Sequence, residues 1–180
     1  SFLLCQSLYH LGDQFAFRYT GSTTAALAHV LHHITRMLED NAYVRCLFID
    51  YSRAFDTINH DLLIRKLISL ELPSFVVRWV ANFLTGRTQA VSSDGKLSSW
   101  LPITQSIVQG SSIGPMLYII FASDLKLLSA TNFLCKYADD KTLMVPENTD
   151  ISLEDEFRHI MQWSVQNKLT LKFTKTKEMI

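Results

Sequence analysis

Two adjacent carboxylates, Asp139 and Asp140, stand between apolar runs in the stretch KYADDKTLMVP, residues 136–146. A tight turn needs only one Asp or Asn, and a second acid beside it adds charge repulsion. A bound divalent cation would reverse that cost, and Mg²⁺ prefers oxygen ligands, commonly one or two carboxylates together with substrate phosphates. Because neighbouring side chains on a strand point to opposite faces, we expect one acid to face the metal and the other to lie beside it at the turn.

A third carboxylate, Asp50, directly follows the apolar run VRCLFI. If that strand lies beside the 132–145 hairpin in one sheet, Asp50 and Asp139 meet at the sheet edge. Three acids there would hold two Mg²⁺ ions, or Mn²⁺ in their place, roughly 3.5–4 Å apart. Such an ion pair stabilises the attacking and leaving oxygens of an in-line phosphoryl transfer without a side-chain nucleophile. Asp residues are also common at strand ends and in turns, so an ordinary surface loop stays open as a reading.

The remaining sequence predicts the helices and strands that must position these acids. Apolar residues recur with helical spacing in the segments 22–41, 59–72, 74–86, 111–128 and 152–168. Short apolar runs predict strands at 44–50, 132–138, 141–145, 169–173 and 178–180, and SDGK marks the turn of a hairpin over 88–103. In the first helix one face collects the apolar residues Leu27, Leu31, Ile34 and Leu38. The mixed order predicts one α+β unit, with an antiparallel sheet packed on helices.

The composition is that of one ordinary globular domain. The 180 residues are 48% hydrophobic, and no apolar run reaches the roughly 18 residues of a membrane span. The net charge of zero argues against a simple basic nucleic-acid binder, although acids gathered in a catalytic site can hide a basic groove. The cysteines show no metal-ligand spacing and predict buried free thiols in a reducing compartment; they are Cys5, Cys46 and Cys135. The chain begins with Ser and stops inside a predicted strand, so we expect a piece of a longer polypeptide.

Five stretches, taken in order, resemble the reverse transcriptase of non-LTR (LINE-type) retrotransposons. QFAFRYTGSTTAAL resembles the late-fingers motif of that family, CLFIDYSRAFDTINHDLLIRKL the first palm motif, and IVQGSSIGPMLYIIFASDL the second. YADD resembles the third motif, and Trp163 followed by NKLTLKFTKTKEM resembles the fourth. YADD alone is a weak signal, whereas the ordered set from Gln14 to Ile180 is a specific one.

The resemblance implies a right-hand polymerase palm with part of the fingers. It implies an RNA-directed DNA polymerase that uses Mg²⁺, deoxynucleoside triphosphates, an RNA template and a DNA primer. Residues 1–43 would belong to the late fingers and residues 44–180 to the palm, while the early fingers and the thumb would lie outside the chain. The catalytic metal acids of the family fall on Asp50, Asp139 and Asp140. We expect an intracellular protein of the cytoplasm and nucleus, without a membrane partner, that belongs to a longer polypeptide with endonuclease and thumb segments.

Four further residues fall on nucleotide-binding positions of the family. Phe55 takes the place of a bulky ring under the sugar, which would clash with a ribose 2′-OH; a buried aromatic at a helix entry is the alternative. Gln109 would contact the incoming nucleotide and Gly110 would let the backbone approach it, although an ordinary strand-to-helix loop also fits. Lys175 matches a lysine that can protonate pyrophosphate in related polymerases, and a solvated strand lysine is equally compatible.

Several positions depart from the family pattern, and together they fit a decayed or divergent copy. They are Ala16, where Gly is usual, Ser106 and Val108, where Gly-x-Pro is frequent, and Lys172, where Asn is frequent. None of these departures removes a metal acid. Because the grip on primer and template would need the early fingers and the thumb, we expect the isolated chain to polymerise weakly or not at all.

Three other functions stay open at this point. A palm for RNA-templated RNA synthesis shares the acids, but a small or polar residue would be expected in place of Phe55. An inactive or domesticated palm, acting as a nucleic-acid or protein interaction module, predicts that Asp139→Asn changes nothing measurable. A nucleotide cyclase needs no template-side loop such as QGSSIGP. The three histidines His29, His32 and His33 lack a matching acid or Cys spacing and predict a solvent face or a packing role.

Overall fold

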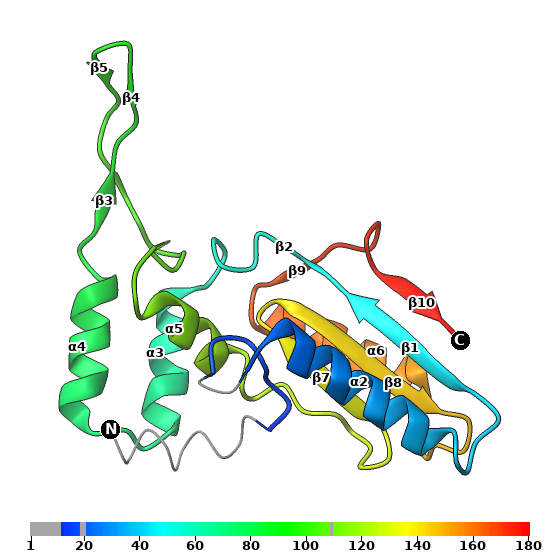
Figure 1. Ribbon diagram of the computed structural model, residues 1–180. Coiled ribbons are helices and arrows are strands. Elements are labelled where there is room, and N and C mark those ends of the chain that lie inside the picture. The colour runs from blue at the N-terminus through cyan, green and yellow to red at the C-terminus, as the bar shows by residue number, and fades with distance from the viewer. Residues whose placement is uncertain (1–11, 19–20, 109) are drawn as a thin grey trace.

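A four-stranded antiparallel sheet forms the centre of the chain. The computed structural model describes residues 12–18, 21–108 and 110–180. The strands lie in the order β10 (Lys177–Met179), β1 (Val44–Ile49), β8 (Asp140–Pro146) and β7 (Phe133–Tyr137). Helix α2 (Thr23–Met37) covers one face of the sheet and α6 (Leu153–Gln166) covers the other (Figure 1).

The two faces of the sheet bury separate sets of side chains because neighbouring strand residues point to opposite sides. Val44 and Cys46 of β1 pack toward Ala26 of α2. Leu47 and Ile49 face the larger core that includes α6. Each of these helices begins directly after a serine that caps it: the Ser22 side chain accepts a hydrogen bond from the amide of Ala25, and the Ser152 side chain accepts one from the amide of Asp155.

A helical block stands beside the sheet. It consists of α3 (His60–Ser69), α4 (Ser74–Leu84) and α5 (Gly114–Phe121). Asn59 caps α3, as predicted, by accepting from the amide of Leu62 at 3.1 Å. The short strands β2 (Tyr51–Ser52) and β9 (Thr170–Leu171) pair with each other. They link the chain just after β1 to the chain just after α6.

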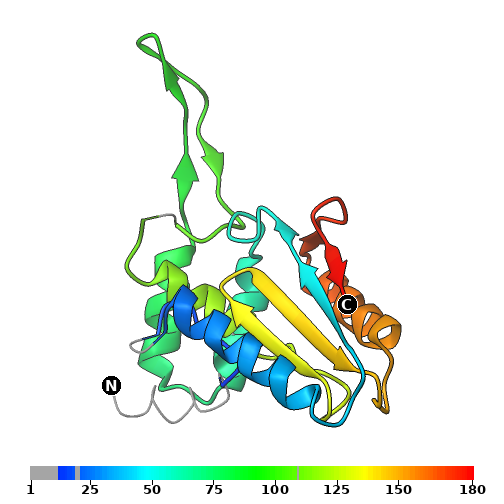
Figure 2. The ribbon, with the colours of Figure 1, turned by 45° about the vertical axis from the view of Figure 1, so that its right-hand side comes forward.

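The predicted 88–103 hairpin forms an arm that projects from the body (Figures 1 and 2). Its base is the pair β3 (Thr88–Gln89) and β6 (Leu101–Pro102), and its tip is the pair β4 (Ser92–Ser93) and β5 (Lys96–Leu97). Asp94 and Gly95 turn the chain between β4 and β5, as the SDGK signal predicts.

Some details differ from the sequence prediction. The packed face of α2 is formed by Ala26 with Val30, Ile34 and Met37, whereas Leu27, Leu31 and Leu38 of the predicted face are exposed. The small Ala26 takes the central position against the sheet, where it packs in one cluster with Val44, Cys46 and Met144. Helix α5 covers only part of the predicted 111–128 segment. Within the described residues, none of the helices combines the length and the apolar character that crossing a membrane requires.

The cysteine and histidine predictions are confirmed where the structure describes them. Cys46 and Cys135 are buried free thiols, and Cys5 lies outside the described residues. The ring of His33 stacks on Phe133 with centroids 3.6 Å apart, which is a packing role. Burial lowers the pKa of His33, with nearby positive charges as smaller causes.

Candidate active site

The structure brings the three predicted acids to one edge of the sheet. β1 pairs with β8 so that Ile49 lies opposite Lys141, which places Asp50 beside Asp140 where the two strands end. β7 pairs with β8 so that Tyr137 lies opposite Asp140, and the connection between them is the two-residue turn Ala138–Asp139. The predicted meeting of the first-motif strand and the YADD hairpin is therefore confirmed.

A cleft opens at this edge. It has a volume of about 420 Å³, and its lining includes Asp50, Asp140 and Lys175. The ammonium Nζ of Lys175 lies 3.5 Å from Oδ2 of Asp50. The predicted fourth-motif lysine thus reaches the first-motif acid, although the two residues are distant in sequence.

The carboxylates at this edge repel one another. Partial burial raises the pKa of the Asp140 carboxyl although the residue remains exposed to solvent, and the negative charges of Asp139 and Asp50 raise it further. The ammonium groups of Lys141 and Lys175 act in the opposite direction. The site therefore carries more negative charge than its own lysines compensate.

This donor set agrees in chemistry with a hard divalent cation. Carboxylate oxygens are the ligands that Mg²⁺ and Mn²⁺ prefer, and a cation would relieve the repulsion that raises the pKa of Asp140. The described residues contain no group of three His, Cys, Asp or Glu side chains close enough together to hold a metal ion as they stand. The three acids are adjacent without forming a closed ligand shell.

The turn between the strands is backbone-strained. Ala138 has φ = +53°, in the left-handed region that residues with a Cβ rarely adopt. Such a conformation costs of the order of 1–3 kcal/mol and persists only where the surroundings hold it. It lies directly before Asp139, so the strain lies next to the candidate metal ligands.

A buried lysine lies beneath this turn. Lys141 is 1% exposed, and its Nζ lies 3.4 Å from the carbonyl oxygen of Asp139 and 4.1 Å from the centroid of the Tyr51 ring. Burial, followed by the charge of Lys136, lowers the pKa of Lys141 to about 7. The sequence analysis did not identify this residue; the available signal was a lysine that directly follows two acids at the start of an apolar strand.

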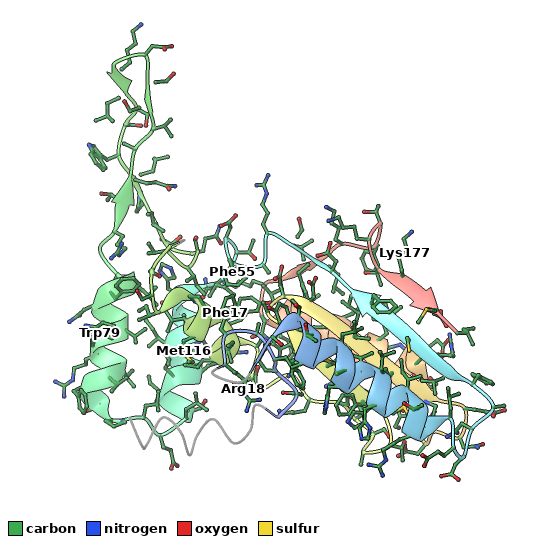
Figure 3. All side chains as sticks on the ribbon, in the orientation of Figure 1. Phe17, Arg18, Phe55, Trp79, Met116 and Lys177 are labelled. Carbon is green, nitrogen blue, oxygen red and sulfur yellow. The ribbon has the colours of Figure 1, made fainter. Side chains whose placement is uncertain are left out.

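A second cavity is lined by residues of the first two predicted motifs. It measures about 350 Å³ and is lined by Phe55, Ile107, Val108, Gly110, Ser111, Gly114 and Pro115. Phe55, which Figure 3 labels, is half-buried. Its ring stacks on Tyr118, with centroids 4.4 Å apart. The amide of Ile107 donates to the carbonyl oxygen of Phe55 at 2.9 Å and so joins the two predicted motifs.

The polar groups around this cavity also bear on its role. Gly110 has φ = +78° and open space where a Cβ would be, and the close approach of a ligand to its backbone stays a prediction. The hydroxyl of Tyr118 is buried and has no hydrogen-bond partner among the residues that the structure describes, and burial together with the charge of Asp139 raises its pKa. Gln109, the remaining predicted nucleotide contact, lies outside the described residues.

The fold and the arrangement of the acids define a class of protein, the right-hand polymerases, of which the chain contains the palm and part of the fingers. A telomerase from Candida tropicalis, truncated from its C-terminal domain, has the same fold: the TM-score is 0.74 at 15% identity, over 99% of this chain and 39% of that one. An RNA-dependent RNA polymerase of a human picobirnavirus matches with a TM-score of 0.53 at 18% identity, over 82% of this chain and 29% of that chain.

Sequence relatives define the family. The model of the family "Reverse transcriptase (RNA-dependent DNA polymerase)" matches residues 9–180, and the chain belongs to that family. It is 32% identical over 165 residues to the RNA-directed DNA polymerase from mobile element jockey of Drosophila funebris, and 32% identical over 142 residues to the probable RNA-directed DNA polymerase from transposon BS of Drosophila melanogaster. These matches cover 85% and 75% of this chain but only 18% and 16% of the relatives. They confirm the resemblance to the non-LTR type.

Proposed function

We propose that the chain is the catalytic core of an RNA-directed DNA polymerase, which extends a DNA primer on an RNA template. The observation that carries the proposal is the meeting of Asp50 with the Asp139–Asp140 turn inside a region that matches the reverse transcriptase family. The buried free thiols Cys46 and Cys135 support action inside the cell, in the cytoplasm and nucleus. The division into late fingers up to residue 43 and palm beyond it stays a prediction.

The residues of the site would have different roles in phosphoryl transfer. Asp50, Asp139 and Asp140 would hold two Mg²⁺ ions, which, when bound, lower the pKa of the primer hydroxyl and neutralise the charge of the leaving pyrophosphate. Lys175 already contacts Asp50, so its ammonium group is placed to contact the phosphate groups of the nucleotide. The ring of Phe55 limits the cavity where the sugar would lie, and Gly110 leaves its backbone accessible there.

Metal binding tests the proposal directly. We expect the 180-residue chain to bind Mn²⁺, and Asp139→Asn to raise the dissociation constant at least about tenfold, equivalent to about 1.4 kcal/mol. Free Mn²⁺ is measured by electron paramagnetic resonance during a titration. The matched control is Asp94→Asn, which removes the same charge from the exposed tip of the arm. Equal binding by wild type and Asp139→Asn would favour the non-catalytic interaction module.

The isolated chain should extend a primer only weakly or not at all. The reason is that the early-fingers and thumb segments of the family would supply most of the grip on the triphosphate and the duplex. Extension of a labelled DNA primer on an RNA template, with Mg²⁺ and deoxynucleotides, measures this. Robust processive synthesis by the 180 residues would contradict the expectation about the fragment and would support the proposed activity.

Phe55→Val is expected to weaken the discrimination against ribonucleotides by roughly 10–100-fold, the equivalent of the 1–3 kcal/mol that an overpacked contact costs. The smaller side chain removes the steric conflict with a 2′-OH. Incorporation of one ribonucleotide or one deoxynucleotide is measured with enzyme in excess, so that the ratio does not depend on the absolute rate. Phe83→Val, in α4 and away from the cavity, is the control. An unchanged ratio would remove Phe55 from the sugar contact.

A further inference from the structure

A segment from the N-terminal part of the chain lies along the free edge of β7, next to the acids. Gln14 bridges to Lys136 in parallel orientation. The amide of Lys136 donates to the carbonyl oxygen of Asp13 at 2.7 Å, and the amide of Phe15 donates to the carbonyl oxygen of Lys136 at 2.9 Å. The segment therefore pairs with β7 at Lys136, two residues before Ala138 in the strained turn.

The side chain of Gln14 reaches the turn itself. It is 1% exposed, and its single amide oxygen Oε1 accepts two backbone hydrogen bonds. One comes from the amide of Ala16 at 2.9 Å and the other from the amide of Ala138 at 3.1 Å. Ala138 is the residue with φ = +53°, directly before Asp139. One side chain thus satisfies the buried N–H of the strained residue and fastens it to a second segment.

Other contacts hold Gln14 in place for this task. The carboxylate of Asp13 pairs with the buried Lys136 ammonium at 2.8 Å, and that ammonium also donates to the carbonyl oxygen of Leu125 at 2.7 Å. The guanidinium of Arg18 donates to the carbonyl oxygen of Gln14 at 3.0 Å. Gly21 lets the chain fold back, since a Cβ there would lie 1.9 Å from the carbonyl oxygen of Phe15. The segment is fixed on both sides of Gln14 before any ligand binds.

We propose that Gln14 is a positioning residue for the metal-binding turn: through the Ala138 amide it fixes the backbone that presents Asp139 and Asp140 to Asp50. This inference rests on the proposed function, because it assigns Gln14 a purpose only if these acids bind a cation. Gln14 touches neither metal nor substrate in this role. It hydrogen-bonds to the backbone that carries the ligands, and the loss of such supporting hydrogen bonds typically weakens metal affinity 10–100-fold.

The test compares variants that differ in the acceptor. In Gln14→Met the chain keeps a similar volume but loses the oxygen, so the amides of Ala16 and Ala138 become unsatisfied. We expect its Mn²⁺ dissociation constant, measured on the 180-residue chain by electron paramagnetic resonance, to rise roughly 10–100-fold. Gln14→Glu keeps an oxygen that accepts both bonds and is expected to retain the wild-type constant. Gln14→Asn, whose oxygen stops one methylene short of Ala138, is the second loss variant if the Met variant fails to fold.

A stability control separates positioning from general destabilisation. Asn132→Leu, at the other end of β7, removes a buried side chain that donates to the carbonyl oxygen of Ile151 at 2.9 Å. It should lower the melting temperature yet leave the Mn²⁺ constant unchanged. Wild-type affinity in a folded Gln14→Met or Gln14→Asn chain, or equal weakening by Asn132→Leu, overturns the inference about Gln14 alone. A wild-type chain that binds Mn²⁺ no better than Asp139→Asn overturns the inference and the metal site together.

Discussion

Asp139→Asn is expected to lower nucleotide incorporation by at least about a hundredfold while it stabilises the metal-free protein. The loss of rate follows because an amide keeps the shape of the side chain but not its charge, and removing one element of charge stabilisation typically costs 10²–10³-fold. The gain in stability follows because the charge of Asp139 helps to raise the pKa of Asp140 in the folded chain. Opposite effects on activity and stability are the mark of a functional group that the fold alone does not favour.

The stabilisation by Asp139→Asn depends on pH. An acid whose pKa is higher in the folded state lowers stability at pH values above that pKa, and the penalty disappears at acid pH, where both states are protonated. The stabilisation by Asp139→Asn should therefore be present near neutral pH and vanish as the pH falls through the acid range. Because Asp140 is exposed to solvent, we expect less than about 1 kcal/mol.

Two measurements check this prediction with the same protein samples. Single-nucleotide incorporation with enzyme in excess gives the rate, and thermal unfolding in EDTA at pH 7 and at acid pH gives the stability. Asp94→Asn, at the exposed tip of the arm, should change neither quantity. An Asp139→Asn chain that keeps the wild-type rate would show that this carboxylate takes no part in the chemistry.

The adjacency of the acids was predictable because it depends on local patterns. An apolar strand that ends in Asp50 and a hairpin with two acids at its turn leave few arrangements in one antiparallel sheet. The cap at Asn59 was predictable for the same reason, since it depends on only a few neighbouring residues, and the caps at Ser22 and Ser152 are local in the same sense.

The supporting residues were not predictable, because their roles depend on segments that are distant in sequence. Gln14 reaches Ala138 across more than a hundred residues of chain, and nothing in QFAF indicates which backbone amide its side chain will meet. The packed face of α2 was assigned wrongly because leucine spacing indicates an apolar stripe, whereas close packing on a sheet favoured the smaller Ala26. Polar groups that serve the site lie inside the core, where hydrophobic patterns alone predict apolar residues.

Lys141→Met is expected to stabilise the metal-free protein by up to about 5 kcal/mol near pH 6, and to abolish part of its pH dependence. The pKa of Lys141 falls from 10.5 to about 7 on folding, chiefly through burial. At about 1.4 kcal/mol for each tenfold change in proton affinity, the whole difference corresponds to about 5 kcal/mol, which is an upper limit. Methionine has a similar length and no charge to desolvate.

The direction of the effect follows from proton binding. Between pH 7 and 10.5 the unfolded lysine is protonated and the folded one is largely neutral, so the unfolded state binds more protons and wild-type stability rises with pH. Below pH 7 the ammonium is present in both states, so its burial lowers the free energy of unfolding by the full amount. The advantage of Lys141→Met should therefore be greatest at pH 6 and disappear toward pH 10.

Urea unfolding in EDTA at pH 6, 7, 8 and 9 measures this difference, with Lys96→Met on the exposed arm as the control that should show none. Parallel pH profiles for wild type and Lys141→Met would mean that the ammonium is solvated or fully paired in the folded chain. A converging profile would mean that the protein keeps a destabilising cation 3.4 Å from the carbonyl oxygen of Asp139. Because the fold without its ligands would then be more stable with an apolar side chain, such a profile would tie Lys141 to the neighbouring acids Asp139 and Asp140 and not to the stability of the fold.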